Sequence, residues 1–104
     1  MGEADAYVAL LLVHLHFPDA ESLKAKRKDL ASVKAQLQGR MGVAVAEVGH
    51  HDLWQRATLA AALTGGSPSV LQSAADRVER FLLERFPESC RVERALASFD
   101  ELSD

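Results

Sequence analysis

The chain has 104 residues, 48% of them hydrophobic and 26% charged, a composition typical of one globular domain with a single core. We therefore expect one domain over residues 1–104. The apolar stretch near the N-terminus, residues 7–13, is too short to span a bilayer and follows acidic residues, which argues against a membrane anchor or a secretion signal. A single cysteine, Cys90, allows no disulfide within the chain and no cysteine metal cluster. A cytoplasmic protein without a cofactor is expected.

The net charge of −3 hides an uneven distribution, because acidic residues are concentrated at the two ends. Five of the 15 acidic residues lie at the ends: Glu3, Asp5, Asp100, Glu101 and Asp104. The residues between the ends therefore include 10 acidic and 12 basic side chains. Four basic residues gather within five positions, at Lys24, Lys26, Arg27 and Lys28. This distribution argues against wholesale polyanion binding but favours a local anionic partner.

The first half of the chain predicts a strand, a helix and a strand pair. Residues 7–17 are apolar on both faces of an extended chain, which indicates a central strand. Ser22 has the residue type of an N-cap, and apolar residues then recur at helical spacing until Gly39, where we expect the helix to end. Residues 43–48 and 57–63 have strand character on either side of a polar turn, which favours an antiparallel pair.

The second half predicts one more helix and one more strand. Ser67 and Pro68 have the residue types favoured at a helix start, and an apolar stripe continues to near Pro87. Residues 91–97 alternate as a strand, and we expect the acidic tail, residues 100–104, to fray. The order βαββαβ predicts a ferredoxin-like α/β domain, an α+β sandwich with sheet order 4-1-3-2 and two helices on one face of a four-stranded antiparallel sheet.

This topology brings three distant segments to one end of the domain. They are the end of the first strand with His14 and His16, the start of the first helix, and the turn over residues 50–56. We expect the functional site there.

Within the basic cluster, Lys26 falls inside the apolar stripe of the helix, whereas Lys24 and Lys28 point outward. A charge on that face needs a partner, which Glu47 or Asp52 could supply. Cations in the first turn of a helix also oppose its macrodipole, which favours a role in anion or phosphate binding. A structural ion pair and an anion site both remain open for Lys26.

Trp54 and Arg56, in the turn, likewise each have a structural and a binding interpretation. Trp54 either caps the core or, beside Gln55 and Arg56, stacks on a base or anchors a partner, and its exposure would decide between the two. Arg56 either holds Asp52 or Glu47 as a structural fork or offers its guanidinium to a phosphate or carboxylate.

Histidines and one cysteine are the remaining candidates for chemistry. His14 and His16 share one side of a strand, and ligands from the turn at His50, His51 and Asp52 would complete a metal site; a structural or surface role is the alternative. Cys90 lies near the start of the last strand, and no serine sits in a recognisable nucleophile elbow. We find no catalytic constellation and expect no enzyme.

Three segments of the chain resemble the YlxP-like bacterial family, small proteins with a domain of unknown function. They are residues 22–27 (Ser-Leu-Lys-Ala-Lys-Arg), 45–48 (Val-Ala-Glu-Val) and 52–59 (Asp-Leu-Trp-Gln-Arg-Ala-Thr-Leu). The resemblance covers nearly the whole chain in order, as far as residues 92–94. It implies a bacterial ferredoxin-like domain and, because genes of this family lie near those of transcription and ribosome-maturation factors, a connection with RNA or the ribosome.

The chain departs from the family at Ala25, where a carboxylate often completes a capping box with Ser22, so a weaker cap is expected. The histidines at positions 50 and 51 occupy a variable stretch. Lys26, Asp52, Trp54, Gln55 and Arg56 match the family pattern.

Three hypotheses follow. The first is an RNA-associated or ribosome-associated binding protein that uses the basic end, with the binding residues Lys24, Lys26, Arg27, Lys28, Asp52, Trp54, Gln55 and Arg56. The second is a homodimeric protein-interaction module, because two helices cover only one sheet face and leave the other open. The residues expected on the open face are Val8, Leu10, Leu12, Ala60 and Ala62. The third is a metal-dependent or small-anion-dependent enzyme using His14, His16 and Asp52.

Overall fold

The structure is a computed structural model that describes residues 4–104, so residues 1–3 of the predicted domain lie outside the described residues. Its strands are β1 (Tyr7–His16), β2 (Ala44–Gly49), β3 (Arg56–Gly65) and β4 (Cys90–Ser98). Its helices are α1 (Leu23–Met41), α2 (Pro68–Arg85) and the one-turn α3 (Phe99–Leu102).

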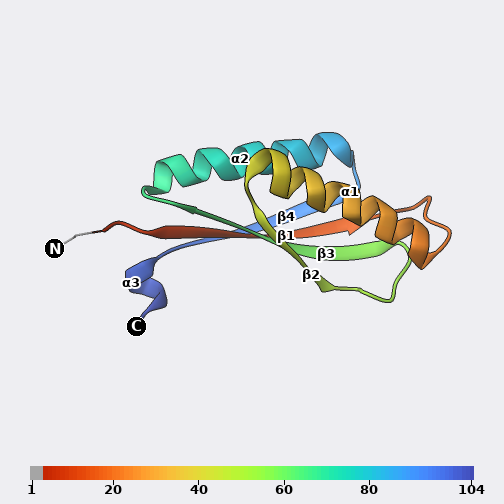
Figure 1. The fold of residues 1–104 in the computed structure, drawn as a ribbon, viewed down its shortest axis with the longest axis horizontal. Coiled ribbons are helices and arrows are strands. Elements are labelled where there is room, and N and C mark those ends of the chain that lie inside the picture. The colour runs from red at the N-terminus through yellow and green to blue at the C-terminus, as the bar shows by residue number, and fades with distance from the viewer. Residues whose placement is uncertain (1–3) are drawn as a thin grey trace.

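The four strands form one antiparallel sheet in the order β2-β3-β1-β4, which confirms the predicted ferredoxin-like topology. Helices α1 and α2 lie side by side on one face of the sheet, and α3 lies away from them, at the end of the molecule where β1 begins (Figure 1). No helix within residues 4–104 is long and apolar enough to cross a membrane.

The core lies between the sheet and the two long helices. Alternation along β1 buries every second side chain against the helices: Ala9, Leu11, Val13 and Leu15. The helices bury matching stripes at helical spacing, Leu30, Val33 and Leu37 from α1 and Leu71, Ala75, Val78 and Leu82 from α2. Each fully buried Leu or Val contributes about 1.5–3 kcal/mol relative to exposure, so this layer fixes the position of both helices.

The opposite face of the sheet is uncovered within residues 4–104. Leu10 of β1 lies between Ala62 of β3 and Ala95 of β4, and its side chain is 44% exposed. The face around it consists largely of alanine and short aliphatic side chains.

The strand ends differ from the expected bounds by one or two residues, and two further differences concern the helices. Helix α1 continues through Gly39 and ends two residues later, where Gly42 adopts a left-handed conformation with φ +64°. The tail, which we expected to fray, forms α3 over its first residues, because Ser98 and Glu101 make a reciprocal capping box. Gly39 was misleading because a glycine in a helix interior is costly but allowed.

The two glycines of α1 give a matched pair of substitutions. Gly42→Ala should lower the free energy of unfolding by about 1 kcal/mol, because a Cβ disfavours left-handed backbone. Gly39→Ala should raise it by about 0.5–1 kcal/mol, because Gly39 is helical and nothing lies within 4 Å of the added Cβ. Urea denaturation of both variants measures the difference, and effects of the same sign would contradict the observed helix end.

Candidate functional site

Three connections meet at the end of the molecule opposite α3 (Figure 1). The amide of His16 donates to the carbonyl of Ser89 at 2.9 Å, which joins the end of β1 to the turn before β4. The amide of Phe17 donates to the carbonyl of Gln55 at 2.8 Å, and the Gln55 side-chain amide donates to the carbonyl of Pro18 at 3.3 Å. These bonds fix the end of β1 against the β2–β3 loop, so Gln55 has a structural contact in addition to its predicted binding role.

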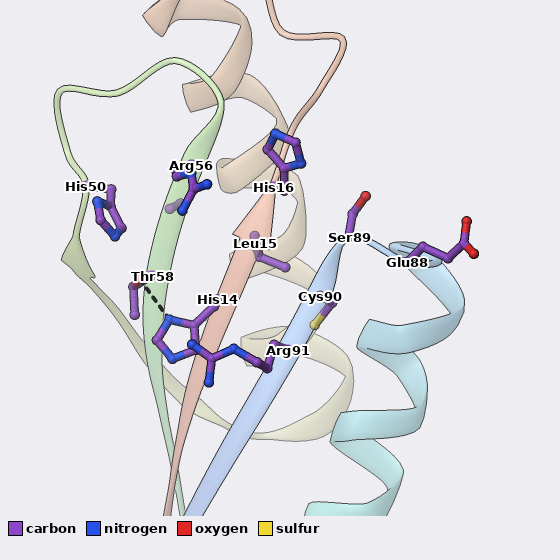
Figure 2. A pocket seen from close by; sticks show the side chains of 11 residues that line it. His14, Leu15, His16, His50, Arg56, Thr58, Glu88, Ser89, Cys90 and Arg91 are labelled. Carbon is purple, nitrogen blue, oxygen red and sulfur yellow. Dashed lines mark hydrogen bonds between the residues drawn. The ribbon is translucent and has the colours of Figure 1, made fainter.

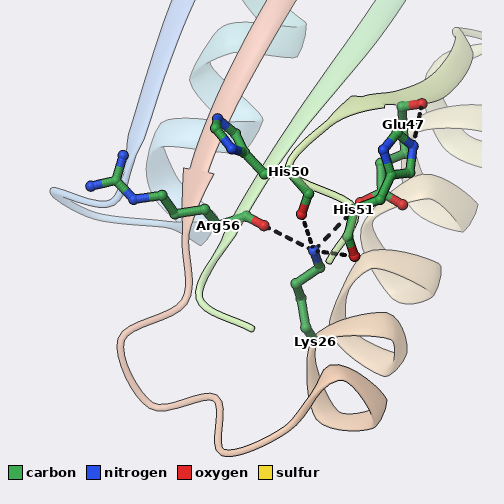
Figure 3. A network of polar contacts seen from close by, with 5 residues as sticks. All are labelled: Lys26, Glu47, His50, His51 and Arg56. Atoms are coloured by element: carbon green, nitrogen blue, oxygen red, sulfur yellow. Dashed lines mark hydrogen bonds and ion pairs between the residues drawn. The ribbon is translucent and has the colours of Figure 1, made fainter. Parts of the chain in front are cut away.

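The ammonium of Lys26, on helix α1, holds the β2–β3 loop by hydrogen bonds to backbone carbonyls. Lys26 Nζ donates to the carbonyl oxygens of His50 at 2.7 Å, His51 at 3.3 Å and Arg56 at 2.9 Å (Figure 3). An ammonium has three donors, so these carbonyls use all of them. Two of these carbonyls belong to the loop and the third to Arg56, the first residue of β3. The carbonyl of His50 also accepts from the amide of Leu53 at 3.2 Å.

Glu47 completes this arrangement. Its Oε2 lies 3.6 Å from Lys26 Nζ, an ion pair without a hydrogen bond. The structural ion pair predicted for Lys26 is therefore confirmed with Glu47, while Asp52 is exposed on the loop. The prediction of Lys26 as an anion-binding residue is wrong, because its side chain is 1% exposed and its donors are occupied.

The ammonium also determines which way the loop side chains point. Because the carbonyls of His50 and Arg56 turn toward Lys26, their side chains point away from it (Figure 3). His50 reaches this conformation with φ +61°. The loop thus has a satisfied inner side and an outer side that carries functional groups.

A hollow of about 450 Å³ lies beside this outer side, between the ends of β1, β3 and β4 (Figure 2). Its polar lining is His14, His16, His50, Arg56, Thr58, Glu88, Ser89 and Arg91. The predicted gathering of His14, His16 and the loop at one end is thereby observed.

One wall of this hollow is a fixed polar chain. The Nδ1 of His14 lies 3.3 Å from Thr58 Oγ1, and its Nε2 lies 2.6 Å from Glu93 Oε2. Arg91 Nη1 lies 3.4 Å from the same carboxylate oxygen. The hydrogen bond from His14 and the charge of Arg91 lower the pKa of Glu93. The exposed carboxylate of Glu93 thus orients the side chains of His14 and Arg91 at the hollow.

Trp54 lies on the outer side of the loop, where its side chain is 53% exposed. The alternative that it caps the core is therefore wrong. A second hollow of about 510 Å³ is lined by the loop residues alone: Asp52, Leu53, Trp54, Gln55 and Arg56. Arg56 lines both hollows and so connects them.

Arg56 does not form the structural fork considered from the sequence. No carboxylate of residues 4–104 lies within ion-pairing distance of its guanidinium, neither Asp52 nor Glu47 included. Its five N–H donors face the two hollows and solvent. An exposed guanidinium without an internal partner is suited to an external anion.

The remaining predicted cations, Lys24, Arg27 and Lys28, are exposed at the start of α1. Lys24 and Lys28 lie on the side of the helix opposite the buried Lys26, which faces the sheet. They therefore share the end of the molecule with the loop but do not line the hollow of His14 and Arg56.

Among residues 4–104 the geometry provides neither a metal-ligand set nor an activated nucleophile. Within residues 4–104, no three His, Cys, Asp or Glu side chains are grouped so that they could hold a metal ion. Cys90 lines the hollow, but burial and the charge of Glu79 raise the pKa of its thiol to about 11. A thiol with that pKa is protonated at neutral pH and is a poor nucleophile.

Sequence reasoning missed Arg91 and Thr58, although the signal for both was present. The predicted sheet order places the last strand beside the first in antiparallel register, and in the structure Arg91 and Thr58 both pair with His14. The exact register was required to see this, because a shift by one residue moves each side chain to the other face.

Removal of the buried ammonium should strongly destabilise the protein. Lys26→Met removes a donor from the carbonyls of His50, His51 and Arg56 and leaves Glu47 without its cation, so the free energy of unfolding should fall by about 3 kcal/mol. Urea denaturation provides the measurement. The control is Lys24→Met, an exposed position where the change should stay within about 0.5 kcal/mol. Similar values for the two variants would contradict the structural role of Lys26.

Comparisons with solved structures support the fold. The chain is similar to the de novo designed protein Foldit4, with a TM-score of 0.55 and 10% identity over 88% of this chain and 96% of that one. It is also similar to the VAO-type flavoprotein MtVAO713 from Myceliophthora thermophila C1, with a TM-score of 0.53 and 18% identity over 92% of this chain but 18% of that one. Identities this low show a shared fold alone.

Comparisons of sequence show the family. The chain is 33% identical over 78 residues to the uncharacterized protein YlxP of Bacillus subtilis (strain 168), which covers 75% of this chain and 80% of that protein. Residues 8–94 match the family described as "Protein of unknown function (DUF503)". The YlxP-like resemblance of the sequence is confirmed, and the chain belongs to the DUF503 family.

Proposed function

We propose that this protein is a non-catalytic, cytoplasmic RNA-associated binding protein, acting on RNA or a ribosomal subunit through the end of the domain that carries the β2–β3 loop. The observation that carries the proposal is the 53% exposed side chain of Trp54, on a loop fixed by Lys26 and next to the unpaired guanidinium of Arg56. Exposed aromatic rings beside arginines are suited to stacking on unpaired bases and binding their phosphates.

The ordering of the loop supports this function. An exposed tryptophan on a flexible loop would lose conformational freedom on binding, whereas a loop fixed by the Lys26 bonds has already been ordered by folding. Lys24, Arg27 and Lys28 add positive charge on the helix side of the same end. This charge favours approach of a polyanion although the whole chain has a net charge of −3.

Salt-dependent co-sedimentation with ribosomal subunits and RNA tests the proposal. Wild-type protein should bind at low salt, and the affinity should fall as salt rises, with a log–log slope of about −2 if three phosphates of a single strand are contacted. The variant Lys24→Glu/Lys28→Glu/Arg56→Glu should not bind, because three cations of this end become anions.

A variant of the same net charge serves as the control. Arg40→Glu/Arg77→Glu/Arg80→Glu reverses three exposed cations away from the loop and should retain most of the binding. Absence of wild-type binding at every salt concentration would refute the proposal. Equal loss in the two variants would attribute binding to net charge rather than to this end.

A specific observation favours self-association as a second function. The open sheet face around Leu10 continues toward α3, where Phe99 is 65% exposed. Leu102 is three residues from Phe99, on the same side of the helix, and is equally open. Large exposed apolar side chains such as Leu10, Phe99 and Leu102 are typical of an interface, and a second copy of the chain would bury them symmetrically.

Light scattering measures this association. The wild-type protein should have a mass twice the 11.3 kDa of one chain, and Leu10→Glu should reduce it to a monomer, because a charge at the centre of the face would be buried without a partner. Val70→Glu, an exposed apolar position on α2, is the control and should leave the mass unchanged. A monomeric wild-type protein would contradict this function without affecting RNA binding.

A further inference from the structure

We infer that the hollow between the ends of β1, β3 and β4 binds one phosphate of a single RNA strand, adjacent to the nucleotide whose base stacks on Trp54. This inference rests on the proposed function and adds to it a site that includes Arg91, His16 and His50. The hollow measures about 450 Å³, within the size range of small-ligand pockets.

Two guanidiniums on different strands define the ligand chemistry. Arg56 lines the hollow from the start of β3 and has no carboxylate partner within residues 4–104. Arg91 lines it from β4, is 68% exposed and contacts only one carboxylate oxygen, so most of its donors are free. The planar guanidinium matches the oxygens of a phosphate and binds it more strongly than a hydroxyl or amide group does.

The other groups around the arginines are hydrogen-bonding side chains and two carboxylates. His16 and His50 line the hollow on either side of Arg56 (Figure 2), and each imidazole can donate a hydrogen bond from a ring nitrogen. His14 is already engaged by Thr58 and Glu93, so it orients the wall. The acidic residues are Glu88, which lines the hollow, and Glu93, which is bound by His14 and Arg91. Glu88 is therefore the carboxylate that opposes an incoming phosphate.

Two of the residues that line the hollow also have an unusual backbone conformation. Within residues 4–104, the non-glycine residues with positive φ are His50 at 61° and Glu88 at 62°. Both line this hollow. Such conformations cost about 1 kcal/mol or more each for residues with a Cβ, and they are concentrated at functional sites.

The second hollow shows why the ligand is a strand rather than a lone phosphate. Arg56 lines both the phosphate hollow and the hollow beside Trp54. A phosphate between Arg56 and Arg91 is therefore next to an exposed indole on which its base can stack. Stacking requires a base that is free of its complement, so the site selects single-stranded over duplex RNA.

Fluorescence of Trp54 tests this directly, because it is the only tryptophan of the chain. An RNA octanucleotide should quench its emission, and a duplex of the same sequence should not. Arg91→Gln should weaken binding about tenfold, the effect expected for loss of a charged hydrogen bond. Glu88→Gln should tighten binding, because it removes the opposing carboxylate. The matched control, Arg77→Gln, lies on exposed α2 surface and should retain wild-type affinity.

The outcomes separate this inference from the proposed function. If wild-type protein binds no RNA, both are refuted. If it binds the octanucleotide but Arg91→Gln matches Arg77→Gln, the phosphate site is refuted and RNA binding stands. If AMP binds as tightly as the octanucleotide and is equally weakened by Arg91→Gln, the ligand is a free nucleotide and the assignment to an RNA strand is overturned. Thermal denaturation of each variant establishes that it is folded.

Discussion

The structure of the domain end that carries the β2–β3 loop depends on one buried ammonium, that of Lys26. Lys26 is almost fully excluded from water, and a charge in that position costs several kcal/mol unless it is fully hydrogen-bonded. The carbonyls of His50, His51 and Arg56 provide those bonds, with Glu47 as the nearby countercharge. The same bonds hold the β2–β3 loop and the start of β3 against helix α1. Ammonium and loop therefore require each other, and the charge in the helix stripe is explained by structure rather than by ligand binding.

The side chains of the site follow from that arrangement. With its carbonyls turned inward, the loop directs His50 and Arg56 outward and leaves Trp54 exposed. Antiparallel pairing then brings Arg91 from β4 and His14 from β1 to the same place. The site thus combines groups from both halves of the βαββαβ chain. His14, Thr58 and Arg91 lie on the same open face of the sheet as Leu10, nearer the end that carries the β2–β3 loop.

The fold was predictable because its signals are local and consistent. Alternation in β1, the stripes of the two helices and the caps at Ser22 and Ser67 each indicate an element, and their order leaves one common topology. The helix end was not predictable from Gly39, because the left-handed residue that matters is Gly42.

The site was predictable in place but less so in role. Topology alone places the loop beside His14 and His16. The sequence could not decide whether Lys26 faces carbonyls or solvent, nor whether Trp54 is buried, because both depend on how the loop folds over the helix. Arg91 required the register of β4 against β1, which follows from packing across the whole sheet rather than from any local pattern.

The most direct test of the account maps the surface that RNA touches. In a titration of ¹⁵N-labelled protein with single-stranded RNA, followed by backbone amide spectra, the largest shift changes should fall on residues 50–56 and 88–91. Changes concentrated instead around Leu10 and Ala95 on the open sheet face, or around α3 at the opposite end, would contradict the claim that the end held by Lys26 is the binding surface.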